Sequence, residues 1–156
     1  MAFLHALAAF CLQMMITIFF SVCSLFMTVC DPCHPDTPNN RKAFRHITGV
    51  EPGKGIRELY ADTEETPFST HKYWFAFEAD RQKMEQLLKR YDLRPVPPEE
   101  STGTVPDTKW SWWNKTERSG AEHYQHQKFS NGDLAESCHL WFQPETKKCQ
   151  LAVICY

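Results

Sequence analysis

The first thirty residues carry no Asp, Glu, Lys or Arg, and every such residue lies from Asp31 onward. The apolar run from Ala6 to Cys30 is longer than the ~20 residues that span a bilayer core. It is also longer than the roughly 7–15 apolar residues at the centre of a signal peptide. The run therefore predicts that residues 1–30 enter a membrane, as a signal sequence or as a hydrophobic membrane helix.

Three fates are open for this segment: a retained anchor, a signal peptide cleaved near Cys30, or a lipid-modified N-terminus. A hydrophobic run followed by Cys23 or Cys30 and then by a polar tether resembles the N-terminus of bacterial lipoproteins. The general layout is similar to that of small bacterial exported proteins of unassigned function. The resemblance implies lipidation at Cys30 and brings no catalytic residues.

The charges around the segment bear on its orientation. No Lys or Arg precedes it, whereas Arg41, Lys42 and Arg45 follow. By the positive-inside rule alone, the rest of the chain would stay in the cytoplasm. The signal-like position and the cysteines of the downstream domain favour export instead. We therefore expect a protein of the cell membrane whose domain lies on the periplasmic or extracellular side.

The remainder of the chain is long enough for one domain. Residues 31–48 are expected to form a tether, because Asp31 to Asn40 contains three prolines. Residues 49–156 are expected to form a small globular domain.

The elements of that domain follow from apolar periodicity. His71 to Glu78 alternates with apolar residues on both faces and predicts a central strand. Asp80 is a suitable N-cap for a helix that ends near Tyr91, and Met84, Leu87 and Leu88 lie on its buried face. Further strands are expected over 55–62, 121–129, 137–142 and 149–156. This order predicts an α+β fold, an antiparallel sheet with one main packed helix.

The motif Cys30-Asp31-Pro32-Cys33-His34 matches the Cys-x-x-Cys-His signature of c-type haem attachment. In that signature two thiols bond the haem and the histidine becomes an axial ligand. We therefore expect no cofactor, with haem c as the alternative. The same cysteines are compatible with redox chemistry, or with a zinc site completed by a pair such as His123 and His126, although the His-x-x-His spacing is shorter than that of a zinc finger.

The last two predicted strands suggest a disulfide. With a turn at Glu145 to Lys148, Pro144 faces Cys149 and Cys138 faces Cys155. Directly opposed residues of antiparallel strands lie within disulfide range. Buried thiols are the other interpretation of these cysteines.

Trp110, Trp112 and Trp113 form a dense aromatic cluster. Exposed, the three rings would make a ligand-binding platform for sugars; buried, they would be part of the core. The sequon Asn114-Lys115-Thr116 bears on function only in a eukaryotic secretory pathway.

Charge and motifs exclude some classes of function. The net charge of −2 and the lack of a basic stripe argue against nucleic acid as a partner. No nucleophile elbow or acid–base pair indicates an enzyme. We expect a membrane-tethered or exported binding domain without catalytic activity, whose partner is an envelope protein or a glycan. A membrane-anchored monohaem electron carrier is the alternative.

Overall fold

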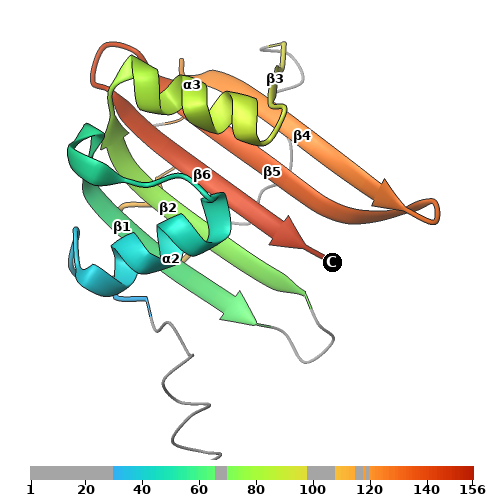
Figure 1. Ribbon diagram of the computed structural model, residues 1–156, viewed down its shortest axis with the longest axis horizontal. Helices are drawn as coiled ribbons and strands as arrows, with labels where there is room; N and C mark the ends of the chain where they lie inside the picture. Colours follow the sequence, from blue (N-terminus) through green and yellow to red (C-terminus); the bar gives the residue numbers. More distant parts are fainter. Residues whose placement is uncertain (1–29, 66–69, 98–107, 115–117, 119) are drawn as a thin grey trace, which may run out of the picture.

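The computed structural model describes residues 30–65, 70–97, 108–114, 118 and 120–156. Six strands form one antiparallel sheet in the order β1-β2-β6-β5-β4-β3 (Figure 1). The strands are β1 Ile56–Glu65, β2 His71–Ala79, β3 Arg94–Pro95, β4 Glu122–Ser130, β5 Asp133–Gln143 and β6 Lys148–Cys155. The predicted α+β class is confirmed. The 71–78 strand is central as predicted, because β2 lies between β1 and β6.

Two helices cover one face of this sheet, α2 Pro38–Thr48 and α3 Arg81–Arg90 (Figure 1). Helix α3 is the one expected from the sequence. The Asp80 side chain accepts a hydrogen bond from the Lys83 amide, which confirms the predicted N-cap. Met84 and Leu87 are fully buried on its inner face.

Helix α2 corrects the expectation of a tether over residues 31–48. Pro38 occupies the first turn, where its missing N–H costs nothing, and the Thr37 side chain caps the Asn40 amide. Gly49 ends the helix in the left-handed conformation at φ 66°. The three prolines were therefore misinterpreted, because one of them starts a helix.

The main core lies between the helices and the sheet. Phe44 of α2 makes edge-to-face contacts with Phe75 and Phe77 of β2, at centroid distances of 5.3 and 5.2 Å. Tyr124 of β4 packs against this core. Buried side chains of three other strands complete it: Leu59 and Ala61 of β1, Cys138, Leu140 and Phe142 of β5, and Cys149, Leu151 and Val153 of β6. Cys30 also belongs to the core, so the folded unit begins before residue 49.

The hairpin between β5 and β6 has a different register from the one predicted. Gln143 pairs with Lys148, so the turn occupies residues 144–147, and Lys147 adopts a left-handed φ of 61°. Cys138 consequently faces Val153, and Cys155 faces Glu136. Direct opposition of Cys138 and Cys155 is therefore wrong, and both residues are free thiols.

The predicted membrane segment, residues 1–29, lies outside the described residues. Within the part of the chain that the structure describes, no helix is both long and apolar enough to cross a membrane.

Candidate functional site

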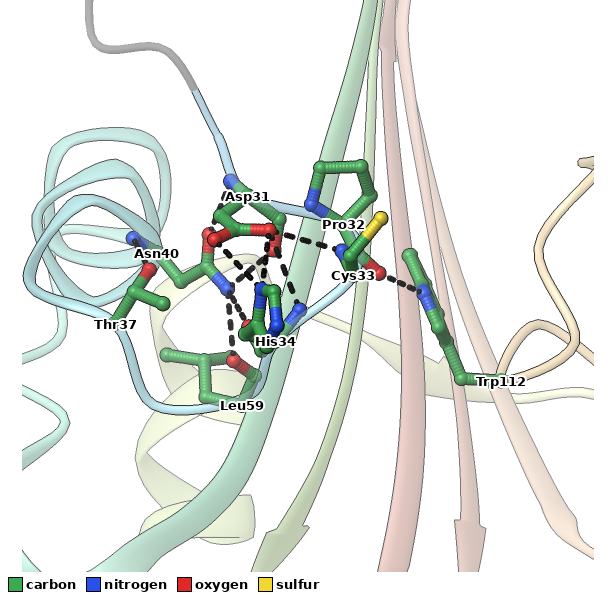
Figure 2. Close-up of polar contacts among 8 residues, drawn as sticks. All are labelled: Asp31, Pro32, Cys33, His34, Thr37, Asn40, Leu59 and Trp112. Atoms are coloured by element: carbon green, nitrogen blue, oxygen red, sulfur yellow. Dashed lines mark hydrogen bonds and ion pairs between the residues drawn. The ribbon is translucent and has the colours of Figure 1, made fainter.

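The segment that contains the Cys-x-x-Cys-His motif is a hydrogen-bonded turn (Figure 2). The Asp31 carboxylate accepts hydrogen bonds from the backbone amides of Cys33 and His34, at 3.0 and 3.2 Å. It also pairs with Nδ1 of His34 at 3.2 Å. The carboxylate engages Nδ1 and thereby fixes the orientation of the ring. In many metal-binding histidines a carboxylate holds one ring nitrogen in this way while the other nitrogen binds the metal.

Asn40 of α2 fixes this turn to the sheet. Its side-chain oxygen accepts from the Asp31 amide at 2.8 Å, and its side-chain nitrogen donates to three carbonyls (Figure 2). Those carbonyls belong to Asp31, His34 and Leu59. Asn40 is fully buried, and one side chain therefore joins α2, the motif and strand β1.

The two cysteines of the motif lie in different environments. Cys33 is exposed, whereas Cys30 is 8% exposed and packs in the main core. Burial, with a contribution from Asp62, raises the pKa of the Cys30 thiol to about 11. A haem bonded through both thiols needs them at one surface, so the turn in this conformation does not fit haem attachment. Lipidation of Cys30 would likewise require its thiol to leave the core.

The tryptophan cluster lies on the other face of the sheet, away from the helices. Trp113 is 3% exposed and packs with Trp74, Trp141 and Ala152. The Trp110 indole nitrogen donates to the Asp62 carboxylate at 2.6 Å. The three rings do not form a flat exposed platform: Trp113 is core, and Trp110 and Trp112 are half-buried.

Trp112 connects this face to the motif. Its indole nitrogen donates to the Pro32 carbonyl at 2.8 Å (Figure 2). Its ring stacks on Tyr60 of β1, with centroids 5.6 Å apart and planes 19° from parallel. The tryptophan cluster and the Cys-x-x-Cys-His turn, 80 residues apart in sequence, are thus one contiguous region.

Two histidines of β4 and β5 extend the aromatic layer. The rings of His123 and His139 stack on Trp141, at centroid distances of 4.7 and 5.7 Å. His123 Nε2 lies 3.3 Å from His139 Nδ1. Burial lowers the pKa of both imidazoles to about 4, with Arg118 adding to the effect on His123 and His123 adding to that on His139. Both rings are therefore neutral at pH 7, and one nitrogen can donate to the other.

The zinc pair suggested by the sequence is not formed. His123 and His126 are three residues apart on strand β4, and side chains alternate between faces along a strand. His123 accordingly packs on Trp141, whereas His126 pairs with Cys138, a residue of the main core on the helix side. Within the described residues, no group of three or more His, Cys, Asp or Glu side chains is arranged to hold a metal ion.

A pocket of about 220 Å³ opens next to Trp112. Its walls come from β1, β2, β6 and the tryptophan segment: Glu58, Tyr60, Ala76, Phe77, Glu78, Trp112, Lys148 and Cys149. Gln150 of β6 lies beside it, where its side-chain nitrogen donates to the Asn114 carbonyl at 3.2 Å. Aromatic walls with a few charged groups are typical of small-molecule sites.

Sequence reasoning found Trp112 but missed its partners. Tyr60 and Glu58 lie in a strand of weak apolar alternation, and only the sheet register brings them beside Trp112. His139 had a detectable signal, because its position two residues before Trp141 puts both on one face of a strand. Comparisons with protein-family models, curated proteins and solved structures gave no match.

Proposed function

We propose that this chain is an exported or membrane-tethered binding domain without catalytic activity, and that its ligand site is the pocket beside Trp112. The observation that carries the proposal is the Tyr60–Trp112 stack, which walls a pocket of about 220 Å³. The hydrophobic N-terminal run supports the membrane location. The ligand would be a small molecule or the end of a glycan chain, because the pocket is smaller than the ~300–1,000 Å³ of drug-sized sites.

A titration of the full chain in detergent micelles tests the binding site. The probe is 2-phenylethanol, a neutral single-ring compound, and the readout is the indole N–H signals in a ¹H–¹⁵N spectrum. We expect the Trp112 signal to shift while that of buried Trp74 stays in place. Trp112→Leu should abolish binding, and Trp110→Leu, on a ring that does not line the pocket, should leave it unchanged. A probe that leaves the Trp112 signal unmoved would refute the site.

The intact mass of the protein purified from membranes tests the N-terminal segment. Buried Cys30 supports an anchor, or cleavage without lipid, over acylation. We therefore expect either the full mass or the loss of about thirty residues with no addition. A gain of an acyl-glycerol mass on Cys30 would show that the thiol leaves the core.

The haem alternative is tested separately. We expect no Soret band that survives acid-acetone extraction from protein matured in cells competent for cytochrome c assembly. A covalent band that disappears in Cys33→Ser would favour the electron carrier instead, since Cys33 is the exposed thiol of the motif.

A further inference from the structure

A β-bulge in β1 brings a carboxylate to the pocket. Arg57 pairs with Glu78 and Tyr60 with Ala76, so residues 58 and 59 together stand opposite Phe77. Leu59 fills the core position and is fully buried, which leaves Glu58 as the extra residue. Bulges commonly redirect a side chain in this way near functional sites.

The backbone at Glu58 is held in an unfavourable conformation. Its φ of 50° is left-handed, a region that favours glycine and costs other residues about 1 kcal/mol or more. The Asp36 carboxylate accepts a hydrogen bond from the Glu58 amide at 2.7 Å, and Asp36 is itself paired with Arg41. The fold thus keeps Glu58, at the rim of the pocket, in a backbone conformation that lowers stability.

The charge of Glu58 is available to a ligand. Glu78, the other carboxylate of the pocket, pairs with Arg57 at 3.3 Å. The carboxylate of Glu58 has no ion pair or hydrogen bond to the residues that the structure describes. Lys148 also lines the pocket; it lies on β6, directly opposite Glu78 of the neighbouring strand β2, and β2 separates it from Glu58 on β1.

The aromatic wall and the free carboxylate together indicate a cation. Tyr60 and Trp112 offer a surface for a ring, and electron-rich aromatic groups attract ammonium ions. We propose that the pocket binds a small primary amine carrying a single ring, with its ammonium group at Glu58 and its ring against Tyr60 and Trp112. This inference rests on the proposed function, because it names the ligand class of the same site.

Two probes of the same shape test the ligand class. Phenethylamine carries an ammonium group where 2-phenylethanol has a hydroxyl, and both are titrated into the full chain in detergent micelles at pH 7. We expect the amine to bind about tenfold more tightly, because only its ammonium group can pair with the Glu58 carboxylate; a tenfold ratio corresponds to roughly 1.4 kcal/mol. Equal affinities would overturn the amine assignment and leave the binding site standing. If neither probe binds, the site and the ligand class both fail.

Variants of two glutamates on the same strand locate the ammonium group. Glu58→Gln keeps the size of the side chain and removes its charge, so the affinity for phenethylamine should fall about tenfold while that for 2-phenylethanol stays constant. Glu64→Gln is the matched control, because Glu64 pairs with Lys72 at 3.6 Å and does not line the pocket. An equal loss in both variants would overturn the role of Glu58. Thermal melts of both variants establish that each is folded.

Discussion

The two faces of the sheet are built from different side chains. Alternation along β2 sends Phe75 and Phe77 to the helices and Trp74 to the opposite side. On the helix side the buried side chains of the strands are apolar, and the buried polar residues Asn40 and Thr48 belong to helix α2, where both are hydrogen-bonded. On the other side the strands bury four polar residues: His123, Ser137, His139 and Gln150.

Hydrogen bonding sharpens this contrast. The indole nitrogens of Trp74 and Trp113 and the side-chain oxygen of Gln150 are buried without a partner among the described residues. Unsatisfied buried polar groups cost stability and need a reason, which is often functional. The helix side therefore supplies most of the stability of the fold. The aromatic side contains buried polar atoms that lower stability, and it carries the pocket. Four predictions test this division, from the largest effect to the smallest.

The largest loss of stability should come from the helix side. Phe44 is fully buried between α2 and β2, so Phe44→Ala removes a ring that contacts Phe75 and Phe77 and leaves a cavity. We expect the free energy of unfolding to fall by about 4 kcal/mol, measured by urea denaturation. Phe129→Ala is the control, because that ring is 60% exposed, and it should cost less than about 0.5 kcal/mol. Similar losses in the two variants would contradict the assignment of the core.

The aromatic side should make the fold sensitive to acid. His123 and His139 have pKa values of about 4 in the folded chain, below the about 6.5 of an unfolded histidine. The unfolded chain therefore binds more protons between these values, and stability falls as the pH drops from about 6.5 to about 4. We expect each of the two imidazoles that becomes protonated to cost about 3 kcal/mol, measured by urea unfolding across this range.

Substitutions test whether His123 and His139 cause this pH dependence of the free energy of unfolding. His123→Gln combined with His139→Gln should flatten the dependence of stability on pH between about 6.5 and about 4. His46→Gln, on the exposed side of α2, should leave it unchanged. A slope that persists in the double variant would mean that other groups are responsible.

The Trp110 indole makes a side-chain hydrogen bond to Asp62 of β1. Trp110→Phe keeps a ring and removes the indole donor to Asp62, so we expect a loss of about 1 kcal/mol in chemical denaturation. Asp62→Ala, which removes the acceptor, should cost a similar amount. If the bond is the cause, the double variant will be less destabilised than the sum of the two single ones. Full additivity would mean that the two residues act independently.

The smallest effect should be a gain. Glu58→Gly relieves the left-handed strain at φ 50°, and we expect it to raise the free energy of unfolding by about 0.5–1 kcal/mol. Glu64→Gly, also in β1 but without a positive φ, should lower stability by about 1 kcal/mol. A loss of stability in Glu58→Gly would remove the argument that the fold tolerates strain there for the sake of the pocket.

Several elements could be predicted from local patterns. The helix that begins after Asp80 and the strand from His71 were correct, because capping and alternation act within a few residues. Helix α2 was missed although Thr37-Pro38 at its start and Gly49 at its end are ordinary helix boundaries. The three prolines between Asp31 and Asn40 are typical of a tether, but Pro38 stands in the first turn, where a helix accepts proline.

The candidate site was less predictable. Trp112 stands out in the sequence, but nothing local indicates that it stacks on Tyr60 or donates to Pro32. The β-bulge at Glu58 and the register of the last hairpin depend on how whole strands align. A shift of one residue in the turn moved Cys155 from Cys138 to Glu136.

The sequence by itself indicated that residues 1–30 enter a membrane, and it determined the α+β class, the central strand and the helix after Asp80. These depend on composition and on short-range periodicity, which are properties of neighbouring residues. The tertiary structure alone decided that Cys30 is buried, that Cys138 and Cys155 do not face each other, and that Glu58 and Trp112 meet at one pocket. Those outcomes depend on strand register and on which face of the sheet each residue joins, and both are set by pairing between segments far apart in the chain.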